Sequence, residues 1–242
     1  MCKAARRATS YAMQKNWVSV VLAAVFVVLG TLGARADLPP GVPGEGALVF
    51  SVRKSGSEVG RHKITFSRSG DVLLVETESA LQLRVAFVTV YRYVQRTRET
   101  WRDGVLIGFD SSVDDNGTPF RIKAVQRDGE LHIDGHQEKH VVARDVKPLS
   151  YWNIGITKVP RAFDVQWGSL AELAVEPRGP EMRQVAGKPV EARRYALRGY
   201  EIRKGERQRT PWLNVDAWYD SGDRLVGLSF HYRGFDFDYV LQ

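Results

Sequence analysis

Four polar residues near the C-terminal end of the chain are of the types that catalytic and binding sites use. A one-residue bulge near Gly234 would keep the apolar side chains between positions 228 and 241 on one face of a strand. The same bulge would gather on the opposite face His231, Arg233, Asp236 and Asp238. There His231 could act as a base or a ligand, oriented by a carboxylate. A solvated outer face with ordinary charge pairs is the simpler interpretation.

Pairs of carboxyl groups could also cleave glycosidic bonds, because that chemistry needs an acid and a base on either side of one bond. The candidate pairs are Asp236 with Asp238, and Glu99 with Asp103. The chain has no Gly-x-Ser-x-Gly nucleophile motif and no phosphate-binding loop. A hydrolase acting on envelope glycans is therefore an alternative function, and we assign no catalytic residue.

Three histidines have a spacing that could hold a metal ion on a helix. His132, His136 and His140 recur every four residues, and a helix would place them on one face. However, Asp-Gly pairs interrupt this stretch, and its apolar residues alternate as in a strand. The only cysteine, Cys2, precedes the predicted cleavage site, so the mature chain has no zinc-type cysteine motif. We predict no metal and no cofactor.

The first 36 residues have the order of a secretory signal peptide. Basic residues, among them Arg6 and Lys15, lead into an apolar run over residues 17–33, and Ala34-Arg35-Ala36 follows. This ending predicts cleavage after Ala36 by the general secretory route and a periplasmic mature protein. A membrane anchor is the alternative for the run, which is at the short limit for spanning a bilayer. After cleavage we expect no transmembrane span.

The positive charge of the chain lies mostly in this leader. The whole chain has a net charge of +7, and the leader holds five of its basic residues and no acidic residue. Subtracting these five leaves +2 for the mature chain. That is too little for the basic surface on which nucleic-acid binding depends, so we exclude nucleic acid as a partner.

The rest of the chain has the pattern of a single all-β domain. Residues 37–45 are rich in proline and glycine and predict a tether, and residues 46–242 form the domain. There, short runs of alternating apolar and polar residues are separated by turn signals such as Asp103-Gly104 and Asn116-Gly117. We predict one curved antiparallel meander sheet that forms an open or half-closed barrel. We expect little helix, with at most one short turn at residues 169–175.

One apolar run indicates where such a sheet could meet a ligand. Residues 85–90 are apolar on both faces of a strand that we expect to continue to Trp101, with a bend near Gln95. One face would line the interior of the sheet, and the other would contact a second apolar surface. The protein's own loops are the simpler candidate for that surface, and a bound ligand is the other.

Three short stretches occur in a characteristic order behind the signal peptide: ETWRDGVL at 99–106, SVDDNG at 112–117 and SYWN at 150–153. Together they resemble an uncharacterised family of exported proteobacterial proteins, catalogued as a domain of unknown function. The family has no established activity, so the resemblance implies no catalytic residue. More remotely, the predicted sheet is similar to periplasmic lipoprotein carriers and lipocalin-like half-barrels, a likeness of fold alone.

These observations favour a periplasmic binding or carrier module whose apolar concave surface holds a lipid-like or amphiphilic molecule. Aromatic side chains and one amide would line that surface, and the candidates are Tyr91, Tyr93, Trp101, Tyr151, Trp152 and Asn153. A scaffold that pairs the edge of its sheet with an unknown protein partner is a third possibility beside the hydrolase.

Overall fold

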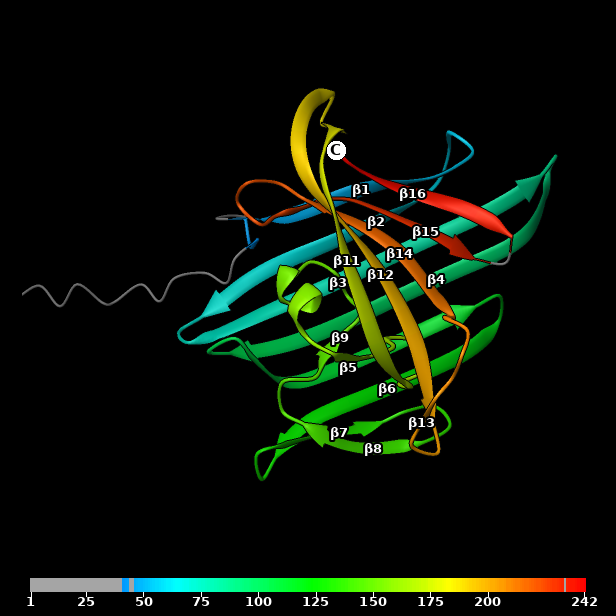
Figure 1. Ribbon diagram of the computed structural model, residues 1–242. Helices are drawn as coiled ribbons and strands as arrows, with labels where there is room; N and C mark the ends of the chain where they lie inside the picture. Colours follow the sequence, from blue (N-terminus) through cyan, green and yellow to red (C-terminus); the bar gives the residue numbers. More distant parts are fainter. Residues whose placement is uncertain (1–40, 44–45, 233) are drawn as a thin grey trace, which may run out of the picture. The chain divides into compact units, whose positions relative to one another are not determined.

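The computed structural model divides into two units, residues 1–35 and residues 36–242. It describes residues 41–43, 46–232 and 234–242, all within the second unit (Figure 1). The predicted signal peptide and Arg233 lie outside the described residues. Among the described residues, no helix combines the length and the apolarity needed to cross a membrane.

Most of the described part of the chain forms strands. In β6, for example, the buried Phe120, Ile122 and Ala124 alternate with exposed residues, which is the period of a strand with one face in a core. One short 3-10 helix, η1, interrupts the series. The elements in chain order are β1 (Ala47–Lys54), β2 (Ser57–Ser69), β3 (Val72–Val85), β4 (Val88–Arg102), β5 (Val105–Asp115), β6 (Thr118–Arg127), β7 (Glu130–Asp134), β8 (Lys139–Ala143), β9 (Lys147–Pro148), η1 (Ile154–Lys158), β10 (Arg161–Phe163), β11 (Leu170–Val185), β12 (Lys188–Arg203), β13 (Glu206–Arg207), β14 (Leu213–Tyr219), β15 (Leu225–Tyr232) and β16 (Phe235–Leu241).

Two-residue turns join several neighbouring strands, as the Asx-Gly pairs predict. Asp103-Gly104, Asn116-Gly117 and Asp128-Gly129 each have positive φ at both residues, which is the conformation of a type I′ hairpin turn. Asparagine and aspartate tolerate this conformation, and glycine adopts it without strain. These pairs therefore determine where the chain reverses and which strands become antiparallel neighbours.

The strands form one sheet that curls into a barrel-like shape, as predicted. The order is β8-β7-β6-β5-β4-β3-β2-β1-β16-β15-β14-β12-β11-β10-β9, with β13 beside β12. The two ends of this path, β8 and β9, are consecutive in the chain, but no ladder of hydrogen bonds joins them. Across this seam, the backbone N–H of His136 donates to the carbonyl of Trp167 at 2.8 Å. Figure 1 shows β11, β12 and β14 passing in front of β3 to β6.

Because all neighbouring strands except the parallel pair β9 and β10 are antiparallel, most connections fall alternately at two ends of the barrel. One end carries the β1–β2, β3–β4, β5–β6 and β15–β16 turns, the loop from β10 to β11 and the loop from β12 to β14. We call this the mouth end. The opposite end carries the β2–β3, β4–β5, β6–β7, β11–β12 and β14–β15 turns.

The prediction that residues 85–90 form the middle of a strand is wrong. β3 ends at Val85 and β4 begins at Val88, so the run lies at a hairpin tip, where Phe87 is fully exposed. Neither face of the run contacts an apolar interior. The ladders along β4 are irregular at Val90, opposite Leu83 and Arg84, and at Thr100/Trp101, opposite Ile107 of β5, and not near Gln95.

The last segment is a hairpin and not a single bulged strand. Tyr232 of β15 lies opposite Phe235 of β16, and Phe230 lies opposite Phe237. Cross-strand partners share a face, so the apolar side chains still line one side of the sheet, as the sequence predicts. The expected helical turn at residues 169–175 is also absent, because Leu170–Val185 is strand β11.

The described part of the predicted tether, residues 41–43, lies against the domain. Gly41 has a φ of +84° and packs so closely against the backbone oxygen of Asp223 that no Cβ would fit there. Val42 packs against the hydrophobic core. This stretch therefore does not stand away from the barrel.

Candidate functional site

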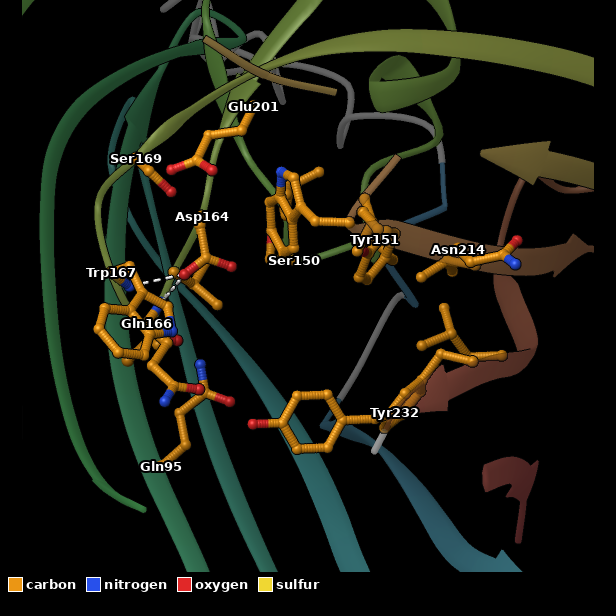
Figure 2. Close-up of a pocket in the computed structure, with 18 of the residues that line it drawn as sticks. Gln95, Ser150, Tyr151, Asp164, Gln166, Trp167, Ser169, Glu201, Asn214 and Tyr232 are labelled. Carbon is orange, nitrogen blue, oxygen red and sulfur yellow. Dashed lines mark hydrogen bonds between the residues drawn. The ribbon is translucent and has the colours of Figure 1, made fainter. Parts of the chain in front are cut away.

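A cavity of about 1100 Å³ lies inside the barrel. Its exposed lining residues Lys204, Glu206 and Trp212 belong to the loop from β12 to β14, so the cavity opens at the mouth end. The volume lies at the upper limit of typical ligand pockets, which enclose roughly 300–1000 Å³. Figure 2 shows this pocket with its polar side chains facing a common space.

One side of the cavity is apolar, and we call it the apolar wall. It is formed by side chains from β1, β15 and β16, namely Phe50, Leu228, Phe230, Phe237 and Tyr239. The rings of Phe230 and Phe237 stack at 5.1 Å between centroids, and Tyr239 lies 6.4 Å from Phe50. Such a surface suits a hydrocarbon chain or ring system, because binding removes apolar area from water.

The facing side is polar, and we call it the polar wall. Alternation along β4 points Tyr93, Gln95 and Thr97 to the interior, and Thr97 lies opposite Thr77 of β3. The Tyr93 hydroxyl donates to Gln95 Oε1 at 3.2 Å. His62 of β2 also lines the cavity, beside Phe50 and Tyr239 of the apolar wall, and burial lowers its pKa to about 4, so it is neutral at physiological pH. The wall therefore offers neutral donors and acceptors rather than positive charge.

Residues 149–163, which we call the plug segment, form the floor of the cavity. Ser150 and Tyr151 line the cavity from this segment, and Figure 2 shows them around the same space as Gln95 and Tyr232. The hydroxyl of Tyr219 donates to the Tyr151 carbonyl at 2.8 Å and ties the segment to β14. The plug segment thus converts an open barrel into a cup.

Two indoles anchor the plug segment to the sheet below the cavity. The Nε1–H groups of Trp152 and Trp101 both donate to Glu99 Oε2, at 3.0 and 2.9 Å. Their rings meet edge to face at 5.5 Å. Trp152 is completely buried, and Phe66 packs on its other side at 5.5 Å. Glu99 therefore connects the plug segment to β4.

Burial raises the pKa of Glu99 to about 7, and hydrogen bonds from neighbouring side chains, that of Trp152 first, oppose this shift. Its second oxygen, Oε1, is buried without a hydrogen-bond partner among the described residues. A protonated carboxyl group avoids placing a full charge in this apolar environment. Glu99 is therefore a structural acid of the barrel floor, below the cavity.

Asp164 and Glu201 bring carboxyl groups to the cavity itself. Asp164 Oδ1 accepts from the backbone N–H groups of Gln166 and Trp167, at 2.9 and 2.6 Å. Burial raises the pKa of Asp164 to about 6, and the charge of Glu201 adds to that rise. Figure 2 shows both carboxyl groups directed toward the pocket. They give this part of the cavity acceptors for a hydroxyl or cationic group of a ligand.

The structure brings together three of the six aromatic and amide residues that the sequence suggested. Tyr91, Tyr93 and Tyr151 line the cavity. Trp101 and Trp152 lie in the core beneath it, bonded to Glu99. Asn153 caps η1, where its side-chain oxygen accepts from the N–H of Gly155 at 2.8 Å.

The described members of the alternative polar group share one face of the β15–β16 hairpin, as predicted, but they form charge pairs and not a site in the cavity. His231 Nδ1 lies 2.8 Å from Asp236 Oδ1 across the β15–β16 hairpin, and both side chains are exposed. Asp238 instead accepts from Arg183 at 2.8 Å, and Arg233 lies outside the described residues. His231 reaches the cavity rim, but neither carboxyl group lines the cavity. The arrangement matches charge pairs on an outer face.

The second suggested carboxyl pair is also separated. Glu99 is fully buried beneath the cavity, whereas Asp103 lies in the β4–β5 turn at the opposite end from the mouth. Neither residue lines the cavity. The pair that does converge there, Asp164 and Glu201, comes from the loop before β11 and from β12.

The three histidines with four-residue spacing lie in different elements and do not form a site together. His132 is in β7, His140 is in β8, and His136 packs against Phe120 and Trp167 at the seam. Within the described ranges, no group of three or more histidine, cysteine, aspartate or glutamate side chains could hold a metal ion.

Sequence reasoning missed most of the cavity. The alternation of Tyr93, Gln95, Thr97 and Glu99 was visible as a polar face of one strand, and it could have indicated the polar wall. No local signal marks Asp164 or Glu201, because they come together through the pairing of β11 with both β10 and β12.

Comparisons with known proteins agree with this architecture. A family model described as Domain of unknown function (DUF6134) matches residues 50–242. Among solved structures, the chain is similar to a beta-barrel-like protein of Domain of Unknown Function DUF1849 from Brucella abortus. The TM-score is 0.55 at 9% identity, over 81% of this chain and 94% of that chain, so the likeness concerns the fold. No curated protein matches.

The predicted resemblance to an uncharacterised family is therefore confirmed, together with its barrel-like fold. Because the family model covers most of its length, the chain belongs to the DUF6134 family of domains of unknown function.

Proposed function

We propose that this protein is an exported binding module that holds one amphiphilic small molecule in its barrel. The observation that carries the proposal is the division of a single cavity of about 1100 Å³ into an apolar wall and a polar wall. An amphiphile would place its hydrocarbon part against the rings of β15 and β16. Its polar group would then face Gln95, Asp164 and Glu201.

The cavity favours binding over the other two candidate functions, hydrolysis and pairing with a partner protein. The carboxyl pairs suggested for hydrolysis, Asp236 with Asp238 and Glu99 with Asp103, do not line the cavity. At the two ends of the sheet, β8 has five residues and β9 has two, one of them Pro148, so these terminal strands offer only short edges for pairing with a partner.

Binding can be tested by titrating the purified protein with N-phenylnaphthylamine, a neutral probe whose fluorescence rises in apolar surroundings. The double variant Leu81→Trp/Leu228→Trp narrows the cavity from two strands and should weaken binding about tenfold or more, because the added rings occupy ligand volume. Val141→Trp/Met182→Trp adds the same rings at exposed positions and should bind like the wild type. Equal affinities of all three proteins, at unchanged unfolding temperatures, would refute a ligand site in the barrel.

The proposed export is tested separately by the mass of the protein recovered from a periplasmic extract. The mass should correspond to a chain that starts at Asp37, because the Ala-x-Ala pattern directs cleavage after Ala36. Recovery of the uncleaved chain from the cytoplasm would contradict the proposed location.

A further inference from the structure

The β3–β4 hairpin projects beyond the rest of the sheet at the mouth end. The β2–β3 ladder stops at the pair Gly60 and Leu81, and the β4–β5 ladder starts at Tyr93. Between these limits β3 and β4 pair only with each other, up to Val85 opposite Val88. Figure 1 shows the hairpin extending past the neighbouring turns. We call residues 82–92 the finger.

The tip of the finger is apolar, although it is surrounded by water. Phe87 is fully exposed, and Val85 and Val88 are 65% and 64% exposed. Ala86 has a φ of +53°, a conformation that asparagine or glycine would adopt with less strain. The turn therefore has apolar residues at positions where asparagine or glycine would reverse the chain with less strain.

Other exposed aromatic side chains lie at the same end of the barrel. Most of the large apolar side chains that are exposed in the described part of the chain belong to the mouth end. Besides the finger they include Trp167, Trp212, Tyr232 and Phe235. Isolated exposed apolar residues are ordinary on a protein surface, but a concentration at one end marks an interaction site.

Basic side chains accompany these residues. Arg84 is exposed next to Val85 in the finger. Lys54 places its ammonium group 3.9 Å from the centre of the Phe235 ring, and Lys204 is exposed on the cavity rim. Amphipathic aromatic rings beside lysine and arginine are the residues that settle at the boundary between lipid head groups and hydrocarbon.

We propose that the mouth end docks on a lipid bilayer that contains anionic head groups, with Phe87 and its valine neighbours inserted among the acyl chains. The exposed apolar side chains do not line one continuous groove. They lie on separate tips, namely the finger, the β15–β16 hairpin and the loops at 164–169 and 204–212. A bilayer plane can meet such tips together, whereas a folded partner needs a continuous complementary surface. The three cations account for a preference for anionic lipid.

This surface lies beside the opening of the cavity. Docking would therefore bring the cavity mouth to the membrane surface, so that an amphiphile could pass between bilayer and barrel without crossing water. The docking proposal itself depends on the exposed residues of the mouth end and not on whether the cavity holds a ligand.

The test is flotation of the purified protein with vesicles of phosphatidylethanolamine and phosphatidylglycerol, compared with vesicles of phosphatidylcholine. The wild type should float with the first and much less with the second. Phe87→Ser/Val88→Ser should reduce flotation about tenfold, because two inserted apolar side chains are lost. Met182→Ser removes an apolar side chain that is 62% exposed in β11, away from the mouth end, and should float like the wild type.

A second measurement reports insertion directly. In Phe87→Trp, the new indole should be quenched by brominated acyl chains, whereas in Met182→Trp it should not. Failure of the wild type to float with anionic vesicles, or flotation unchanged by the finger substitutions, would overturn the proposal. A photo-crosslinker at position 87 that captures a protein in intact cells, without vesicle binding in vitro, would identify the surface as a protein interface instead.

The two proposals fail separately. If the finger variant loses flotation but still binds N-phenylnaphthylamine, docking and ligand binding are distinct properties of the mouth end and the cavity. If the wild type floats but binds no probe, the docking surface stands and the proposed binding function does not.

Discussion

Glu99 shows how one buried carboxyl group can organise the base of a barrel. It accepts the indole N–H groups of Trp101 and Trp152 and thereby joins the sheet to the plug segment. Burial raises its pKa from 4.5 to about 7, so the folded protein holds this proton more tightly than the unfolded chain. The resulting stabilisation is complete below about pH 4.5 and is lost as the pH rises through 7.

Glu99→Gln should remove much of this dependence on pH. The glutamine cannot ionise, and its amide oxygen can still accept from both indoles. Between about pH 5 and pH 8, ionisation of Glu99 should lower the unfolding free energy of the wild type in urea by up to about 3 kcal/mol relative to that of the variant. The exposed Glu78→Gln serves as the control and should follow the wild type. Parallel pH profiles for Glu99→Gln and the wild type would show that this carboxyl group stays ionised in the fold.

Asp164 gives the cavity a charge that changes near neutral pH. Its pKa is raised to about 6, mainly by burial, so the carboxyl group is neutral at pH 5 and ionised at pH 8. Dodecyltrimethylammonium should therefore bind about fivefold more tightly at the higher pH, whereas a neutral dodecyl glycoside should not.

Asp164→Asn should abolish most of this difference, since its oxygen can still accept from Gln166 and Trp167 and preserve the loop. Fluorescent probe displacement at the two pH values measures both affinities. An equal pH effect in the wild type and the asparagine variant would remove Asp164 from the binding site.

At the level of elements, the plug segment distinguishes this barrel from an open tube. Its attachment rests on Trp152, which has no solvent exposure and packs between Phe66 and Trp101. Trp152→Ala should lower the free energy of unfolding by about 3–5 kcal/mol, as expected for loss of a large buried aromatic side chain. Trp152→Phe keeps a ring but loses the hydrogen bond to Glu99 and should lose less, about 1–3 kcal/mol.

Hydrogen exchange should locate the effect of Trp152→Phe. Amides of residues 150–163 should exchange faster relative to the wild type, with smaller changes in β6 and β15. A uniform increase over the whole sheet would mean that the plug segment does not open as a separate unit.

The strands and several turns were predictable because their signals are local. Asp103-Gly104, Asn116-Gly117 and Asp128-Gly129 reverse the chain by their own backbone preferences. The β3–β4 turn was missed because Ala86-Phe87 has no such preference, so a hairpin tip looked like the middle of an apolar strand. The β15–β16 turn was taken for a bulge, since both arrangements place the same apolar side chains on one face.

At the level of the whole molecule, the cavity depends on distant parts of the sequence. The polar wall comes from β3 and β4, the apolar wall from β1, β15 and β16, and the floor from residues 149–163. Tyr91, Tyr93 and Tyr151 could be proposed from their residue types, but Asp164 and Glu201 meet because β11 pairs with both β10 and β12. Trp101 and Trp152, proposed as cavity residues, are instead held in the core by a carboxyl group.

The proposed function requires that the barrel of the native protein holds an amphiphile. The most direct measurement is native mass spectrometry of the protein isolated from its own cell envelope without detergent, beside the Leu81→Trp/Leu228→Trp variant isolated in the same way. The wild type should carry one additional small molecule that is released on unfolding and extracts into organic solvent, and the variant should carry much less of it. A wild-type protein that shows only the mass of its polypeptide, and takes up no lipid from an envelope extract, would contradict the proposed function.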